Sequence, residues 1–374
     1  MATPFSKSQD FSWRLLEFFV LEGSKGMSGR LPGNDPFVRL VLQLSQSDNL
    51  IWSALLAFSG SRMAVMYALP TLEHTTHTRP WSNYERRSGR GTGRRKRSLL
   101  GNPRNYLRSH LRATRELVKI AQGHASAHQY SEIYGVLFEV YTYYSSMITF
   151  QYSAEEVDIY ANIESLQFYR SLRGYSTFGY IMVAACDLFT LMPEVALFGL
   201  LIRNSTKEDR RCLGVDLLYR RLAADIMAWQ DHSLAQPLPE VEASVKVTLI
   251  YQNALLAFLH ASYLCEDTDR HLLYMTLKPI VADALSLFES VKAMTVAVTS
   301  FWPLVILGSC LREQQDKDRL LSYLNQQSYK SGIQGRACKA LMWMWGRQSE
   351  GEGVFGPVGL ERYTRENNSG LFIG

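Results

Sequence analysis

Apolar side chains recur along this chain at helical spacing, and this periodicity restricts its fold more than any other feature. Residues 35–44 begin with Asp-Pro, a pair typical of a helix start. Apolar residues then follow at positions i, i+3, i+4 and i+7, namely Phe37, Leu40, Val41 and Leu44. A similar stripe lies at 218–229, formed by Leu218, Leu222, Ile226 and Trp229.

The segments at 107–123, 240–264, 269–291 and 303–327 also have helical patterns, whereas the alternation typical of strands is scarce. We therefore expect an all-α fold, a single large multi-helix domain with an internal disordered basic loop.

Two segments depart from the helical pattern. Residues 71–104 are first polar and then strongly basic and rich in glycine, which predicts an exposed loop. Residues 348–374 contain closely spaced glycines and predict a loosely attached tail. The predicted organisation is N-terminal helices over 1–70, a basic loop over 71–104, the main helical domain over 105–347 and a C-terminal tail over 348–374.

The charge of the chain is uneven. Its 374 residues include 40 basic and 35 acidic side chains, and seven of the basic ones lie in RRSGRGTGRRKR at 86–97. The remainder is therefore slightly acidic, and it predicts no general basic face for a phosphate backbone. The two clusters in the basic segment suit a nuclear import signal made of Arg86, Arg87, Arg94, Arg95, Lys96 and Arg97. A solvated loop or gene-model artefact and a non-specific DNA contact are the alternatives.

No residue pattern indicates a catalytic, cofactor or metal site. The five cysteines are scattered, and no two have the spacing that holds a structural zinc. The sequence EHTTH at 73–77 is interpreted as a loop with solvated histidines rather than a metal site. The acidic run at 266–269 is interpreted as the cap of the next helix. The aromatic run at 134–152 is interpreted as core packing, with a hydrophobic ligand pocket as the alternative. We expect no cofactor and no enzyme activity.

One uncharged stretch approaches the length of a membrane span. Residues 293–311 carry no charge, but polar residues and Pro303 interrupt the run. Two buried helices meeting at a short turn explain this stretch better, so no membrane partner is expected.

The order of segments resembles the fungal-specific regulatory domain of zinc-cluster transcription factors. DPFVRLVLQLSQSDNLIWSALLAFSGSRM (35–63), HLRA (110–113) and ASVKVTLIYQNALLAFLH (243–260) are similar to successive passages of that domain. SFWPLVILGSCLREQQDKDRLLSYL (300–324) is the most similar passage, because its Trp-Pro step, following glycine, polar break and amphipathic helix all recur in the family. ALMWMW (340–345) resembles the closing helix.

Trp302, Pro303 and Gly308 form the structural signature of this resemblance. Proline suits a first helical turn, the tryptophan before it can anchor the helix, and the glycine allows another helix to approach closely. These are structural roles rather than catalytic ones. The chain departs from the family in two places: no cysteine precedes Cys186, so the six-cysteine zinc cluster is missing, and the basic loop replaces helical sequence between Met66 and His110.

The resemblance implies a nuclear transcriptional regulator. Because factors of this family often belong to secondary-metabolite gene clusters, the resemblance also implies that the protein regulates such a cluster. Its expected partners are proteins, either other transcription factors or a second copy in a homodimer, with DNA contacted only indirectly or non-specifically. A truncated gene model of a zinc-cluster DNA-binding factor is one alternative. An all-α metabolic enzyme without a recognisable motif is another, because a catalytic site need not leave a linear motif.

Overall fold

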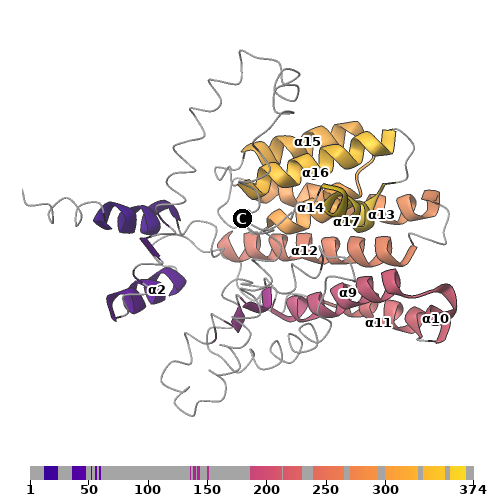
Figure 1. Cartoon of the computed structure of the whole chain (residues 1–374), viewed down its shortest axis with the longest axis horizontal. Helices are drawn as coiled ribbons and strands as arrows, with labels where there is room; N and C mark the ends of the chain where they lie inside the picture. The colour runs from indigo at the N-terminus through magenta and orange to yellow at the C-terminus, as the bar shows by residue number, and fades with distance from the viewer. Residues whose placement is uncertain are drawn as a thin grey trace, which may run out of the picture.

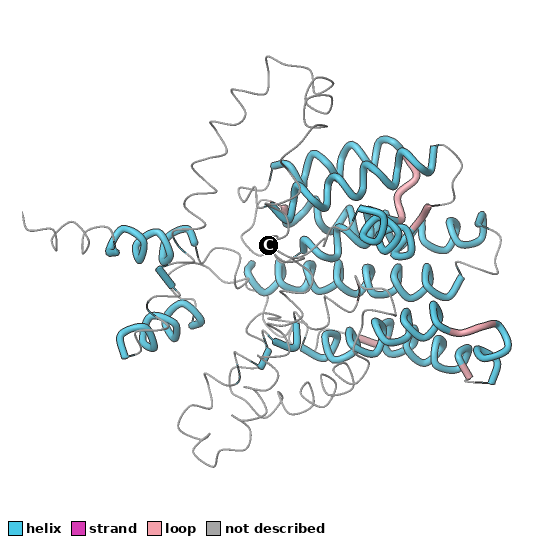
Figure 2. The backbone as a smooth tube through the Cα atoms, in the orientation of Figure 1, coloured by secondary structure: helices cyan, strands magenta, loops and turns pink. Residues whose placement is uncertain are grey.

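The protein is all-α throughout the part of the chain that its computed structural model describes. That part comprises residues 12–23, 36–47, 186–212, 214–229, 239–264, 270–292, 300–326, 332–349 and 354–367, with positions 52, 55, 56, 59, 135, 138, 139, 141–143 and 150. Of these residues, 92% are helical and none lies in a strand (Figure 2). The fold class expected from helical periodicity is therefore confirmed.

Eight of the described helices build the main body, and Figure 1 shows them stacked in layers. In chain order they are α9 (Cys186–Asn204), α11 (Val215–Met227), α12 (Pro239–Leu264), α13 (Arg270–Val291), α14 (Phe301–Ser309), α15 (Gln314–Gln326), α16 (Gly332–Ser349) and α17 (Gly356–Asn367). The short helix α10 (Lys207–Cys212) joins α9 to α11. The patterns at 240–264 and 269–291 thus predict α12 and α13 to within a residue or so.

Helix α12 is the centre of this body. It packs against α9 and α11 on one side and against α13, α14 and α17 on others (Figure 1). A helix contacted on several sides must be apolar around much of its circumference. Ile250, Ala254, Leu255, Ala257, Phe258 and Leu259 of α12 are all fully buried. Its continuous apolar sequence therefore reflects its central position.

One helix among the described residues is long and apolar enough to cross a bilayer, and it is this same helix. The stretch Val245–Leu264 meets the criterion of length and composition, but 67% of its apolar window is buried inside the protein. Such burial is typical of a core helix. The uncharged stretch at 293–311 includes only the nine-residue helix α14 within its described part, which is too short for a span.

Local capping explains where α10 begins. Thr206 Oγ1 accepts a hydrogen bond from the Asp209 amide at 3.2 Å, and the Asp209 carboxylate accepts one from the Thr206 amide at 3.1 Å. This reciprocal capping box satisfies two backbone donors that have no helical partner. The Thr206 hydroxyl and amide lower the pKa of Asp209, which keeps the carboxylate charged at the helix N-terminus.

The helical pattern over 303–327 contains two helices, separated at the polar break that the family resemblance implies. Helix α14 ends at Ser309 and α15 begins at Gln314. In the break between them, the Arg312 guanidinium lies 5.0 Å from the Tyr274 ring centroid and 5.3 Å from that of Phe355. The chain leaves the helical path here to dock between α13 and the start of α17.

The prediction of a loose tail over 348–374 is wrong for most of that segment. Helix α16 continues to Ser349, and α17 packs against α12, α14 and α16. Leu360 and Tyr363 are buried, and Arg203 of α9 forms a largely buried ion pair with Glu361 at 3.3 Å. Gly359 fits because a β-carbon there would lie 2.4 Å from the Met344 methyl group. Glycines that suggest a loop in sequence permit close helix packing instead.

Near the N-terminus, residues 12–18 are helical and lead into a π-helical turn, η1 (Phe19–Gly23); α2 (Pro36–Ser47) starts at the predicted proline. Phe19, Val38 and Leu55 form a small buried cluster of their own. The predicted helix at 107–123 lies outside the described residues.

Candidate functional site

Trp302 lies at the centre of the main core. Its side chain is 2% exposed, and its ring centroid lies 4.7 Å from that of Phe150 and 5.9 Å from that of Tyr251. Phe150 in turn meets Phe258 edge-on at 4.6 Å. Such aromatic pairs add to the free energy of burial. The indole Nε1 is buried and makes no hydrogen bond to any described residue, so the side chain contributes through its ring alone.

The described members of the aromatic run at 134–152 belong to this same core. Phe138, Tyr141 and Phe150 are at most 4% exposed. Tyr143 packs against the core and its hydroxyl lies 3.4 Å from that of Tyr251. The interpretation of the run as core packing is confirmed for these positions.

Gly308 marks the place where α14 crosses α15 and α16. A β-carbon at this position would lie 2.5 Å from Leu320 Cδ2 and 3.1 Å from Leu341 Cδ1. The Trp345 indole N–H donates a hydrogen bond to the Gly308 carbonyl oxygen at 3.1 Å. The signature glycine and the closing tryptophan helix therefore meet directly, and Pro303 is buried on the same helix.

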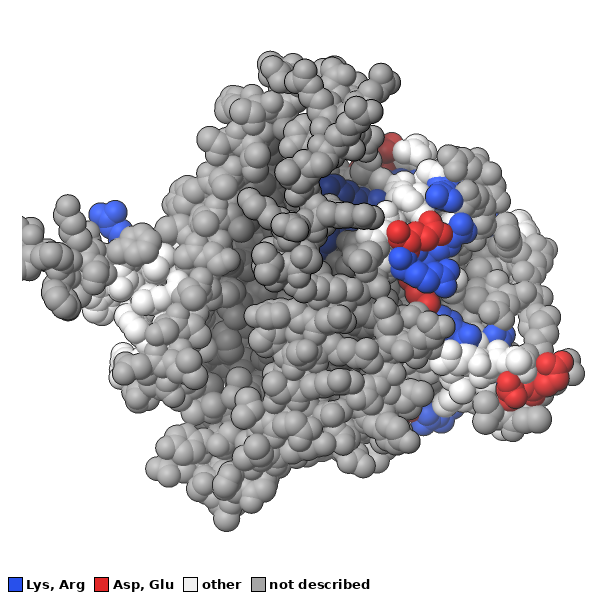
Figure 3. Space-filling model, viewed as in Figure 1, with Lys and Arg blue, Asp and Glu red and all other residues white. Residues whose placement is uncertain are grey.

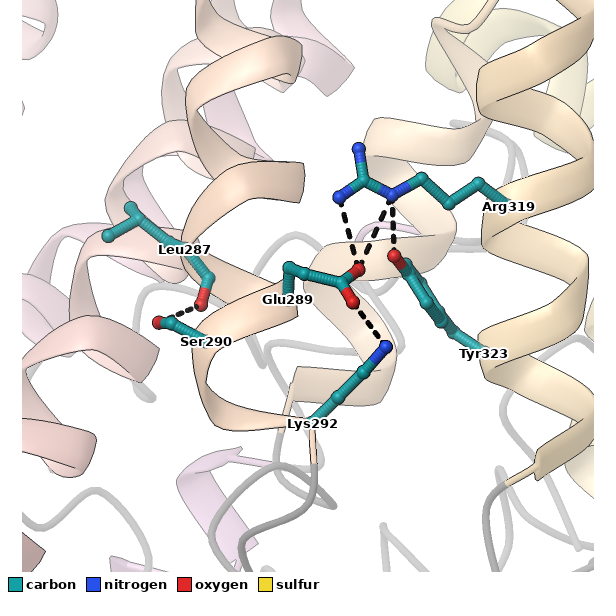
Figure 4. A network of polar contacts seen from close by, with 6 residues as sticks. All are labelled: Leu287, Glu289, Ser290, Lys292, Arg319 and Tyr323. Carbon is teal, nitrogen blue, oxygen red and sulfur yellow. Dashed lines mark hydrogen bonds and ion pairs between the residues drawn. The ribbon is translucent and has the colours of Figure 1, made fainter.

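A surface network ties α13 to α15, as Figure 4 shows. The Glu289 carboxylate accepts hydrogen bonds from Lys292 and from Arg319, and Arg319 Nε donates to the Tyr323 hydroxyl at 2.5 Å. The hydrogen bond from Lys292, followed by that from Arg319, lowers the pKa of Glu289. Because the Glu289, Lys292 and Arg319 side chains are more than a third exposed, their ion pairs add little stability.

A polar and aromatic chain joins α11 to α12. Tyr219 and Tyr263 stack at 4.0 Å between ring centroids. The Tyr219 hydroxyl lies 2.7 Å from His260 Nδ1, and the Tyr263 hydroxyl donates to Asp216 at 2.7 Å. Burial lowers the pKa of His260, so its imidazole is neutral at pH 7 and can accept the Tyr219 proton in a hydrogen bond.

These groups are poorly suited to catalysis. The hydrogen bond to Asp216 raises the pKa of Tyr263 to about 12, and burial raises that of Tyr219. Burial also raises the pKa of the Cys310 thiol to about 12. Protonated phenols and a protonated thiol are weak nucleophiles. Within the described ranges, no three His, Cys, Asp or Glu side chains gather as metal ligands.

On the coloured part of the face drawn in Figure 3, Lys and Arg side chains lie among Asp and Glu side chains. The basic segment with Arg86, Arg87, Arg94, Arg95, Lys96 and Arg97 lies outside the described residues, as do the segments at 73–77 and 266–269.

Comparison with known families decides what this helical body is. A family model for the fungal specific transcription factor domain matches residues 100–356, which is more than half of the chain. The chain belongs to the fungal specific transcription factor domain family. This family consists of transcription factor domains, not enzymes. No curated protein and no solved structure gives a significant match.

The family match begins just after the basic segment and ends where α17 begins. Trp302, Pro303 and Gly308 therefore lie inside the fungal transcription factor domain, and the six basic residues lie outside it. Sequence reasoning missed α17 and the contacts between Tyr219, His260 and Tyr263. Leu360, Tyr363 and Thr364 do have helical spacing, but the glycines around them obscure the pattern.

Proposed function

We propose that this protein is a nuclear regulator of transcription that works through protein partners bound to its helical regulatory domain. The observation that carries the proposal is the family match over residues 100–356, which includes the helices from α9 to α16. Transcriptional regulation itself follows from membership of the family. The nuclear location and the dependence on partners are the proposed part.

The distribution of charge supports indirect rather than direct contact with DNA. Sequence-specific reading needs a rigid element that places side chains in a groove. The described surface mixes both signs of charge (Figure 3), and the one strongly basic segment lies outside the family domain. A protein partner that reads DNA would then supply the sequence specificity.

A secondary-metabolite gene cluster is the proposed setting. Its support is the family resemblance alone, so the target genes have to come from experiment. Deleting the gene is expected to change the transcript levels of a contiguous set of biosynthetic genes. Genome-wide measurement of transcripts checks this. Scattered changes in primary metabolism would contradict this setting but leave the regulatory role intact.

The basic segment is the proposed nuclear import signal. Replacing Arg94, Arg95, Lys96 and Arg97 by Ala is expected to move a fluorescently tagged protein from nucleus to cytoplasm. Adding an unrelated import signal to this variant should restore the nuclear location, which separates transport from misfolding. Exposed loop substitutions usually change stability by less than about 0.5 kcal/mol, so the unfolding midpoint should not move.

If the segment contacts DNA instead, the same variant stays nuclear. DNA affinity of the wild-type protein would then fall steeply with salt, because phosphate contacts release counterions. Tight, sequence-selective binding by the isolated wild-type chain would contradict both the non-specific contact and the proposed dependence on a DNA-reading partner.

A tethering experiment tests regulation directly. The chain is fused to an unrelated DNA-binding module and placed upstream of a reporter gene, and a change in reporter transcription is expected. The import-signal variant fused to the same module, which carries its own nuclear signal, should act like the wild type. A reporter that responds to neither fusion would contradict the proposed function.

A further inference from the structure

The outward face of α13 carries a largely apolar stripe that no described part of the chain covers. Its members recur at alternating spacings of three and four residues, and all five are exposed: Leu272, Met275, Pro279, Ala282 and Ser286. Leu272 and Met275 are each 53% exposed despite their size. Spacing of this kind is the seam of a two-stranded coiled coil, in which each helix presents one narrow stripe to its partner.

The opposite face of α13 is already used by the core. Leu273, Leu277, Ala284, Leu285 and Phe288 are buried, and the helix packs along α12. Glu289 at its C-terminal end is held by Lys292 and Arg319 (Figure 4). The core therefore fixes the direction and rotation of α13, and the apolar stripe is presented to solvent on a rigid element.

Two opposite charges flank the stripe on opposite sides. Lys278 precedes Pro279 and Asp283 follows Ala282, so the two lie five residues apart. Among the described residues Asp283 makes no ion pair, and the Lys278 ammonium lies only over the Tyr274 ring, at 5.7 Å from its centroid. In a parallel pair of helices, flanking residues five apart meet across the seam. Lys278 of each copy would then face Asp283 of the other.

Helix direction decides whether these charges can pair. Thr276, Asp283 and Ser290 lie on one side of the stripe, and Lys278 lies on the other. In an antiparallel arrangement each side of the stripe meets the same side of the other copy. Asp283 would then face Thr276 and Ser290 rather than a cation. In the parallel arrangement the two-fold axis runs along the helices and creates two identical Lys278–Asp283 pairs. The charge pattern of α13 therefore favours one partner and one orientation: a second copy of this chain, in parallel.

Small residues at the centre of the stripe allow close approach. Pro279 and Ala282 occupy adjacent layers, and neither side chain extends far from the backbone. Pro279 also removes the backbone N–H that would bond to the Met275 carbonyl, and such a proline bends a helix. Contact is thereby limited to the few turns around Pro279, which predicts a weak, concentration-dependent association.

We propose that two copies of this protein associate in parallel through the outward face of α13, with Lys278 and Asp283 pairing across the seam. This inference concerns assembly and holds whether or not the basic segment directs nuclear import. It identifies the surface that would make the protein a symmetric regulator with two identical faces for further partners.

Analytical ultracentrifugation of the full chain over about 1–100 μM tests the proposal. The wild type should shift from monomer to dimer across this range. Lys278→Asp and Asp283→Lys should each weaken dimerisation about tenfold or more at low salt, because like charges then face each other twice. Exposed Lys339→Asp on α16 changes the net charge by the same amount as Lys278→Asp and serves as the matched control for that variant, with dimerisation unchanged.

Mixing the two charge-reversed variants in equal amounts is the decisive measurement. In the heterodimer, the aspartate introduced into one chain faces the lysine introduced into the other, and the native Asp283 and Lys278 form the second pair. Both contacts are attractive again, so association should return to about the wild-type level.

Three outcomes would each overturn the proposal: a wild type that stays monomeric throughout, a dimer insensitive to both reversals, or a mixture that fails to associate. Unchanged unfolding midpoints of the single variants would show that α13 itself stays folded.

Discussion

At the scale of single residues, Trp302 joins two aromatic side chains of the core. It contacts Phe150 and Tyr251, which come from segments far apart in the chain, and it is almost completely buried. Its indole N–H makes no hydrogen bond within the described part of the chain. A buried donor without a partner has a cost in free energy, so the ring contacts must outweigh it.

Trp302→Ala is expected to lower the free energy of unfolding by about 3–5 kcal/mol, because it leaves a large cavity between these rings. Trp302→Phe keeps an aromatic ring and removes the unpaired donor, so its cost should be only about 1–2 kcal/mol. Chemical denaturation of both variants provides the measurement. An unchanged midpoint for Trp302→Ala, together with loss of reporter regulation, would instead identify a binding residue.

At the scale of elements, α17 closes the core. It covers α14 and α16 with Leu360 and Tyr363, and its Glu361 pairs with Arg203 at the end of α9. Burying a few large side chains contributes roughly 1.5–3 kcal/mol each. The helix lies almost entirely beyond the C-terminal end of the family match, yet it is packed as part of the same body.

A stop codon after residue 353 should therefore destabilise the protein by about 5 kcal/mol or more, because it removes α17 and exposes the apolar surface of α14 and α16. A stop codon after Asn367 is the matched control, since it retains the whole helix and should leave the thermal unfolding midpoint within a few degrees of the wild type. Equal stability of the two truncated chains would mean that α17 contributes nothing to the core.

At the scale of the whole molecule, the chain combines a continuous helical core with a nearly balanced charge. Apart from the basic segment at 86–97, acidic residues slightly outnumber basic ones. On the coloured part of the face in Figure 3, side chains of both signs lie near one another. This composition suits a protein that binds other proteins better than one that follows a phosphate backbone.

The purified chain is expected to contain no stoichiometric zinc. Thiolate is the form of cysteine that binds zinc, and burial keeps the Cys310 thiol protonated by raising its pKa to about 12. The cysteines are also too widely spaced for a local clamp. Metal analysis after dialysis against a mild chelator is the measurement. One or more zinc ions retained per chain would contradict this expectation.

The sequence by itself determined the fold class, because a core built from helices requires apolar residues at a period near 3.6. Local signals also placed individual helices. Pro36 marks the start of α2, and the stripe of Leu218, Leu222 and Ile226 is the inward side of α11. The order of the motifs at 35–63, 110–113, 243–260, 300–324 and 340–345 indicated the family, and the family match over residues 100–356 confirms it.

Only the tertiary structure decided how ambiguous segments are used. The glycines of α17 predict a loop when read alone, but Gly359 has no side chain and therefore lets the helix dock against Met344 and Val354. The sequence indicates a polar break after Gly308, but only the tertiary contacts show what the break does: Arg312 lies over the rings of Tyr274 and Phe355. Likewise, both faces of α13 contain apolar residues. Contact with α12 determines which face is buried and leaves Leu272 and Met275 exposed, because burial depends on neighbours that are distant in sequence.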